Sequence, residues 1–347
     1  MLNPVHPFFY LLAYLVVLYV RPQEYVPAFV GSPIVPALLG FAAFFWLVAQ
    51  RKNFEAPQHR LMPGLALAMF ISVALTGWMG GAVGMVVLFI PTMMLFYLTA
   101  TMVDSLKRFR EVCLVLTAVA CVLAFHGVQQ AATEDGVGWT GAKMIEGRIT
   151  YLGFLNDPND LAMALVMTVP LTLYLASTSG SFIFTNVYRA AAALILYGVY
   201  LCNSRGSLLA IGAMLFVYSV GRFGWVRSVI VAPMLGLPLL FLAPSRLGEI
   251  SADEDSASGR IEAWYEGFQM LRSHPVFGVG SGLFTDHHPL TAHNSFVLAI
   301  AELGVFGYFF WLAIVAFSAL MLYRLLRSER PAAVRSEPAG PDTAANT

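Results

Sequence analysis

Charged residues are scarce in this sequence. They make up 12% of its 347 residues, whereas 58% of the residues are hydrophobic and the mean hydropathy is +0.71. Soluble domains average about 25% charged residues, so this chain has too few to cover a water-facing surface of its size. The apolar residues come in long blocks, which is typical of a protein whose solvent is lipid. The composition excludes an ordinary soluble domain and predicts a polytopic integral membrane protein surrounded by membrane lipids.

Other common signals are also missing. The formal net charge is zero and no basic tract stands out, so we expect no nucleic-acid partner. Cys113, Cys121 and Cys202 each lie in an apolar block without CxxC or Cys/His spacing, and we interpret them as small hydrophobic residues in helices. The N-terminal segment lacks a positive n-region and a small-residue cleavage site. We therefore expect a retained first helix, although its apolar run is short, and no cleaved signal peptide.

The apolar blocks predict an all-α fold, a polytopic transmembrane helix bundle of about ten spans. Prolines inside three of the blocks are compatible with spanning helices, because neighbouring helices can satisfy a freed carbonyl. The expected spans are Phe8–Val20, Ile34–Ala49, Leu61–Trp78, Ala82–Val103, Phe109–Gln129, Asp160–Ser177, Phe182–Cys202, Ser207–Val220, Val226–Leu242 and Val305–Leu326.

The distribution of lysine and arginine predicts the orientation of the chain. With the N-terminus in the cytoplasm, most of the 20 basic residues fall in cytoplasmic segments, as the positive-inside rule requires. Both termini then lie inside, and two long loops, about 131–159 and 243–304, lie on the non-cytoplasmic side. The tail 328–347 is rich in Ala, Pro, Ser and charge, so we expect a disordered cytoplasmic tail.

The second of these loops holds most of the unusual polar residues. Apolar residues recur at helical spacing from Gly259 to Ser273, which predicts an amphipathic helix lying on the membrane surface or capping the bundle. Arg260 falls in the first turn of this expected helix, where a cation opposes the helix dipole. Either an anion or a salt bridge to Glu262, Glu266 or another loop carboxylate would hold it there. The residues alone leave both alternatives open.

Two further segments of this loop suggest sites. GVGSG, from Gly278 to Gly282, has no strand before it, so we interpret it as a tight connection and not as a dinucleotide loop. TDHHPLTAHN offers Asp286, His287, His288 and His293, but no ligand pair has the spacing of a helical metal site. One catalytic histidine with two solvated neighbours explains this segment with fewer assumptions than a metal does.

His293 begins the last apolar stretch and is the candidate base, because a neutral imidazole accepts a proton near physiological pH. A hydrogen-bonded interfacial histidine is the alternative. Glu302 lies nine positions on and would fall on the opposite helix face, so we expect it to cap or pack at the Gly304 bend. Arg205 lies in a short outer turn, where an arginine needs a carboxylate, a phosphate or water. Asn159 or Asp160 is suited to cap the helix that follows.

Five blocks, read together, resemble the O-antigen ligase family, which shares a domain with O-antigen and capsule polymerases. They are FLNDPNDLA (154–162), NSRG (203–206), SGRIEAWYEG (258–267), HPVFGVGSGLF (274–284) and AHNSFVLAIAELGVFG (292–307). The resemblance covers roughly residues 153–327, whereas residues 1–152 match only as hydrophobic helices and a first long periplasmic loop.

The resemblance implies a membrane glycosyltransferase with a multi-helix fold of the GT-C type in the bacterial inner membrane. The implied reaction is inverting and needs no metal or other cofactor. Its donor is a glycan on undecaprenyl diphosphate, and its acceptor is lipid A–core or another glycan or protein. By the same resemblance, Arg205 and Arg260 bind the diphosphate at a periplasmic site and His293 serves the acceptor. Asn159, Trp264, Asn294 and Glu302 are the supporting residues.

These residue types suit that chemistry. Guanidinium groups bind phosphate oxygens in bidentate fashion and stay protonated, and a base near pH 7 assists the attacking hydroxyl. A polymerase that joins lipid-linked repeat units would use the same reacting centre, so it remains an alternative. A transporter for lipid-linked sugar is a third possibility, but transporters usually place charges in mid-membrane and show paired halves. Here the notable polar residues gather at the outer edge of the membrane.

Overall fold

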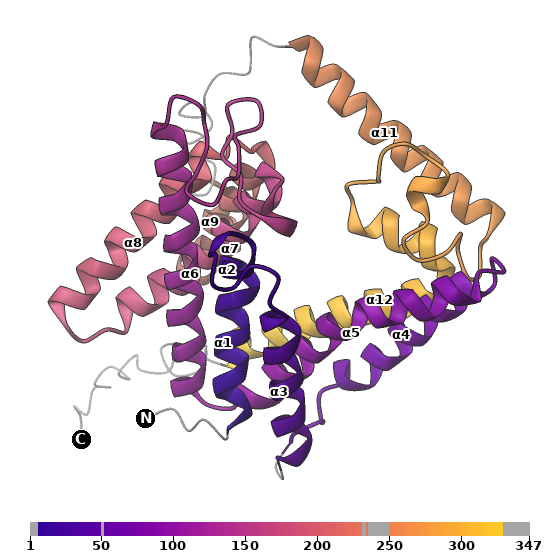
Figure 1. Ribbon diagram of the computed structural model, residues 1–347, viewed down its shortest axis with the longest axis horizontal. Helices are drawn as coiled ribbons and strands as arrows, with labels where there is room; N and C mark the ends of the chain where they lie inside the picture. Colours follow the sequence, from indigo (N-terminus) through magenta and orange to yellow (C-terminus); the bar gives the residue numbers. More distant parts are fainter. Residues whose placement is uncertain (1–5, 50–51, 231–233, 235–249, 329–347) are drawn as a thin grey trace, which may run out of the picture. The chain divides into compact units, whose positions relative to one another are not determined.

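The computed structural model describes residues 6–49, 52–230, 234 and 250–328, and it shows α-helices, short 3-10 helices and loops there but no β-strand (Figure 1). The named helices are α1 (Pro7–Val20), α2 (Pro22–Tyr25), α3 (Ile34–Val48), α4 (Gln58–Ala74), α5 (Met79–Met102), α6 (Leu106–Ala132), η1 (Gly153–Leu155), α7 (Pro158–Ser177), α8 (Phe182–Leu201), α9 (Arg205–Phe223), α11 (Ile250–Ser273), η3 (Phe284–Asp286) and α12 (Ser295–Ser328).

The all-helical prediction agrees with this part of the chain. Every predicted span except Val226–Leu242 coincides with a helix, and most of that span lies outside the described residues. Six helices, α5 to α9 and α12, are long and apolar enough to cross a membrane, while α1 and α3 are shorter apolar helices. The chain is therefore a multi-pass membrane protein, and the count of ten spans stays a prediction. The tail 329–347 also lies outside the described residues.

The chain divides into two compact units, 1–53 with 91–250 and 54–90 with 251–347, so α5 contributes to both. In the first unit, α6, α7 and α8 pack against one another around a core that includes Leu123, Leu165 and Ile195. Gly198 allows this close packing, because a Cβ there would press on Ala124. Helix α1 lies against α3 and α6 in the same unit.

A buried glutamine orders the first long loop in this unit. Gln130, at the end of α6, is fully buried; its side chain donates to the carbonyl of Ala142 (2.8 Å) and accepts from the backbone N–H of Thr150 (3.0 Å). The loop after α6 folds back over the helix end, and the Tyr151 hydroxyl donates to the carbonyl of Val20 (2.7 Å). These bonds satisfy buried backbone groups that would otherwise be costly.

In the second unit, α4 and α12 pack side by side, as Figure 1 shows. Gly64 permits the close approach, because a Cβ there would overlap the ring of Phe310. The loop between α11 and α12 covers a small hydrophobic core, whose members include Met270, Phe284 and Val297. This core joins the two helices that flank the loop.

Two helices in this unit begin earlier than the sequence predicted. Helix α11 begins at Ile250 and not near Gly259, and α12 begins at Ser295 and not near Val305. The bend expected at Gly304 is present as a kink inside α12, with φ of 59° and ψ of −169°, which glycine adopts readily. The prediction placed the bend correctly but treated the apolar stretch before it as loop.

Candidate functional site

Helix α11 presents most of its large apolar residues outward, Met270 excepted. Ala263 and Gly267 face the core of the second unit, whereas Ile261, Tyr265 and Phe268 are exposed. The periodicity therefore predicted the helix, but its apolar stripe does not pack inside the described chain. An exposed apolar stripe favours the membrane-surface alternative over a helix that caps the bundle.

A tryptophan of α11 holds the backbone next to the candidate base. The indole N–H of Trp264 donates to the carbonyl of Ala292 (2.8 Å), and Ala292 is fully buried. His293 follows with an exposed side chain and a φ of 46°. A non-glycine residue seldom adopts such a backbone, and it keeps one only where its surroundings enforce it. Trp264 is thus placed to fix the direction of His293.

Asn294 secures His293 from the other side. Its side-chain oxygen accepts from the backbone N–H of Phe296 (3.0 Å), and its carbonyl accepts from Leu298 (2.9 Å), so it caps the start of α12. A cap of this kind satisfies N–H groups that have no partner within the helix. His293 therefore lies between two backbone positions that hydrogen bonds hold in place.

The glycine-rich segment braces the kink of α12. The N–H groups of Val279 and Gly280 donate to the carbonyls of Ala301 and Glu302 (both 3.0 Å), and Val305 donates to the carbonyl of Pro275 (2.9 Å). Gly278 lies so close that a Cβ would overlap the backbone of Glu302. GVGSG is therefore a tight connection, as predicted, and its glycines permit backbone contact with a helix.

Glu302 takes part in the same brace. One carboxylate oxygen accepts from the N–H of Gly282 (2.9 Å) and the other from Phe284 (3.3 Å). The carboxylate thus bonds to the loop beside the Gly304 bend, where we expected it to cap or pack. Its described hydrogen bonds support the loop that leads to His293.

Arg260 lies well inside α11, so the dipole argument made from the sequence was wrong. It depended on a helix start near Gly259, whereas ten residues of α11 precede Arg260. Arg260 is exposed, and within the described residues its guanidinium has no hydrogen bond or ion pair, so the alternative of a salt bridge to Glu262 or Glu266 is not seen there. Arg260 stands one turn before Trp264, on the same side of α11 as the indole that bonds Ala292.

The other histidines of the loop differ from one another. His287 is exposed, and its Nδ1 lies 3.0 Å from the carbonyl oxygen of Leu283. His288 is buried against Phe284, and its Nδ1 contacts the backbone of Leu290. The expectation that both were solvated was therefore wrong for His288, which completes the loop core. Across the described part of the chain, no three His, Cys, Asp or Glu side chains are grouped to hold a metal ion.

Arg205 belongs to the first unit, at the exposed first position of α9. Its neighbour Ser204 donates to the side-chain oxygen of Asn159 (2.8 Å), which also accepts from Arg148 (2.7 Å). Asp157 and not Asn159 or Asp160 caps α7, accepting from the N–H of Asn159 (2.7 Å). The expected cap was wrong by two or three positions, because Pro158 occupies the first helical position.

Sequence reasoning missed Arg148, which links the first long loop to the turn before Arg205. Its Nε donates to the carbonyl of Cys202 (2.8 Å) at the end of α8. Arg148 is far in sequence from the NSRG motif, so nothing in the sequence indicated that it bonds the turn before Arg205.

The structure thus groups the predicted residues into two sets. Trp264, Asn294 and Glu302 support the loop of His293 and Arg260 in the second unit, and Asn159 supports the turn of Arg205 in the first. That the two arginines and the histidine meet in one pocket stays a prediction.

Comparison with known families gives one match. Residues 190–312 match the family model described as O-Antigen ligase (Wzy_C). No curated protein and no solved structure matches the chain. The matched segment contains Arg205, Arg260 and His293, together with four of the five sequence blocks, while FLNDPNDLA precedes it. The match confirms, over residues 190–312, the predicted resemblance to the O-antigen ligase family.

Proposed function

We propose that this chain is a membrane glycosyltransferase that transfers a glycan from undecaprenyl diphosphate to an acceptor hydroxyl, as an O-antigen ligase does. The family match supports a glycan-transfer enzyme of the ligase or polymerase type. The observation that carries the proposal is the arrangement around His293. Trp264 and Asn294 hold its backbone, and the guanidinium of Arg260, which has no partner in the described chain, lies one helical turn from Trp264.

The proposed reaction is a single displacement. The acceptor oxygen bonds to the anomeric carbon while the bond from that carbon to the phosphate oxygen breaks, and undecaprenyl diphosphate leaves. The acceptor hydroxyl gives its proton to His293. Arg260 and Arg205 bind the diphosphate and stabilise the charge that grows on it, because guanidinium groups match phosphate oxygens and remain cationic. Attack from the face opposite the leaving group inverts the anomeric centre.

His293→Ala tests the proposal directly. The full-length protein, reconstituted with labelled undecaprenyl-diphosphate glycan and candidate acceptors, should transfer glycan, and the variant should be slower by about 10²–10⁴-fold, the usual contribution of a general base. Donor binding and thermal stability should stay close to wild type, because the imidazole is exposed and has no hydrogen bond among the described residues. Transfer by His293→Ala at the wild-type rate would overturn the assignment.

The same assay separates the alternatives. A ligase yields one discrete adduct for each acceptor, whereas a repeat-unit polymerase yields a ladder of lipid-linked products of increasing length. Addition of a chelator should leave the rate unchanged, because the proposed mechanism uses no metal. A transporter would move lipid-linked sugar between leaflets without changing the size of any product.

A further inference from the structure

The second unit contains a cavity that the proposed reaction does not use. Its volume is about 570 Å³, and it lies between the turn that joins α4 to α5 and the segment that follows α11. The side chains that give it chemical character are Trp78, His274, Asp286 and His287. Neither Arg260 nor His293 lines it. The cavity and the candidate base are thus separate features of the same inter-helix loop.

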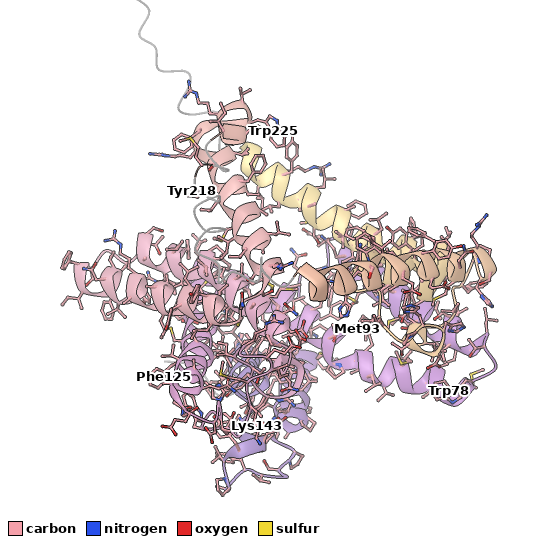
Figure 2. The ribbon with its side chains drawn as sticks, turned by 90° about the horizontal axis from the view of Figure 1, so that it is seen from above. Trp78, Met93, Phe125, Lys143, Tyr218 and Trp225 are labelled. Carbon is pink, nitrogen blue, oxygen red and sulfur yellow. The ribbon has the colours of Figure 1, made fainter. Side chains whose placement is uncertain are left out.

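An exposed aromatic face forms one wall of the cavity. Trp78 immediately precedes α5, where it is labelled in Figure 2, and its side chain is 57% exposed. Its ring packs over Gly81, where any Cβ would overlap the indole. The ring is therefore supported on the side of the helix, and a ligand can reach it from the cavity. A supported ring with a free face is suited to stack on a flat, weakly polar partner.

Unused hydrogen-bonding groups stand around this wall. His274 bonds Ser273 (3.0 Å) and His287 bonds the carbonyl of Leu283 (3.0 Å), in each case through Nδ1, so each imidazole leaves Nε2 available among the described contacts. The Asp286 carboxylate is exposed and has no hydrogen bond within the part of the chain that the structure describes. The cavity therefore offers an anionic acceptor and two imidazole nitrogens beside an aromatic plane.

This combination selects among ligand classes. Lipid phosphate does not fit, because no lysine or arginine lines the cavity and Asp286 would repel it. An acyl chain would bury the carboxylate and the imidazoles without hydrogen-bond partners, which is unfavourable for each group. A sugar ring fits both requirements: its C–H face packs on an aromatic ring, and its hydroxyl groups donate to a carboxylate and exchange hydrogen bonds with imidazoles.

We infer that this cavity is a saccharide-binding subsite that holds a sugar of the acceptor away from the attacking hydroxyl. The inference rests on the proposed function for the identity of the molecule that carries the sugar. Trp78 stacks on one ring of the saccharide, and Asp286, His274 and His287 bond its hydroxyl groups. His293, farther along the same loop, then meets the acceptor hydroxyl.

Saturation-transfer difference NMR on the purified full-length protein tests the subsite. The probe is the pool of oligosaccharides released by mild acid from the envelope of the cell that encodes the chain. We expect signal transfer to sugar protons in the wild type and a Kd raised about tenfold or more by Trp78→Ala, a loss of about 1.4 kcal/mol in binding. Asp286→Asn should also weaken binding, and because Asp286 is exposed it should not impair folding.

Trp225→Ala is the matched control. Trp225 is another exposed tryptophan, labelled in Figure 2, and it does not line the cavity, so this variant should bind the oligosaccharides like the wild type. Equal binding by Trp78→Ala and the wild type, or no binding by the wild type, overturns the inference. The first result would mean that Trp78 only anchors the chain at the lipid interface.

Arg260→Lys keeps this test separate from the proposed function. The variant should transfer glycan about 10²-fold more slowly yet bind oligosaccharides as the wild type does, because Arg260 does not line the cavity. If the wild type binds sugar in a way that depends on Trp78 but transfers no glycan, the proposed glycosyltransferase is refuted and the subsite stands. If the wild type transfers glycan but Trp78→Ala binds sugar as well as the wild type does, only the subsite is refuted.

Discussion

Arg260 and Arg272 are both exposed arginines of α11, but they lie on different faces of the helix. The helical periodicity places Arg260 with Trp264, which bonds Ala292, and places Arg272 in the last turn with the exposed stripe of Ile261 and Tyr265. The pair therefore allows an effect of position to be separated from an effect of charge.

We predict that Arg260→Lys lowers the rate of glycan transfer by about 10²-fold, because a point charge does not replace a bidentate fork on phosphate. Arg272→Lys should change the rate less than about twofold, since surface substitutions away from special features are usually neutral. Both rates are measured in the reconstituted assay at equal protein. If the two variants behave alike, Arg260 has no special role in binding the diphosphate.

Trp264 is a positioning residue, because it acts through the backbone of Ala292 and not on substrate. Trp264→Phe removes the indole N–H and keeps an aromatic ring in the helix, at a cost of about 0.5–1.5 kcal/mol for one hydrogen bond. We expect kcat to fall about tenfold with KM nearly unchanged, since looser placement of His293 affects the transition state more than binding. A purely structural role would lower the fraction of folded protein and leave kcat per folded molecule intact.

At the scale of elements, the contact of residues 275–280 with the α12 kink places the strictest steric requirement on a residue, at Gly278. Gly278 has a φ of 72° and lies against the backbone of Glu302, whereas Gly180 has a φ of 63° and open space around its α-carbon. An alanine at either position has a strained backbone, and only an alanine at Gly278 also meets another chain segment.

Gly278→Ala should therefore destabilise the protein more than Gly180→Ala. We expect Gly180→Ala to cost about 1 kcal/mol from the positive φ alone and Gly278→Ala to cost several times as much. The midpoint of thermal unfolding in detergent measures both, and glycan transfer should fall with Gly278→Ala because the loop carries His293. Equal shifts of the midpoint would show that the contact with Glu302 contributes nothing.

The elements also show how much of the fold could be predicted from the sequence. Apolar blocks and helical periodicity were enough to place the helices, because burial in lipid leaves a long signal that depends on few details. The start of α11 and the cap of α7 could not be placed, since a helix end depends on which of several polar side chains reaches its N–H groups. Asp157 caps α7 in place of Asn159, because the side chain of Asn159 bonds Arg148 and Ser204 from distant parts of the chain.

The site follows the same division. His293, Arg260 and Arg205 were predicted from motifs and stay predictions as site residues, whereas the contacts that support their backbone join separate segments. Trp264 binding the carbonyl of Ala292 and Glu302 binding the loop amides join residues 28 and about 20 positions apart. The cavity beside Trp78 left no signal at all, because residues 72–78 and 274–287 approach only in the folded chain.

For the whole molecule, the second unit gives a geometric basis for topology. Gln58, at the start of α4, bonds Ser318 in the second half of α12 (3.2 Å), and Ser72, near the end of α4, accepts from the N–H of Ser281 (3.1 Å). Helices α4 and α12 are therefore antiparallel, with residues 54–57 and the loop of His293 at opposite ends. Because α12 is long and apolar enough to cross a membrane, we expect these ends to face opposite compartments.

The positive-inside rule predicts that residues 54–57 face the cytoplasm, and cysteine labelling in intact cells tests this prediction. Glu55 and Thr285 are both exposed and lie at the two ends. We predict that Thr285→Cys reacts with a membrane-impermeant maleimide that enters the periplasm, and that Glu55→Cys reacts only after the inner membrane is opened. The wild type measures the background from the three native cysteines, of which Cys113 and Cys202 are buried. Labelling of Glu55→Cys in intact cells with protection of Thr285→Cys would put His293 in the cytoplasm, where a periplasmic transfer could not occur.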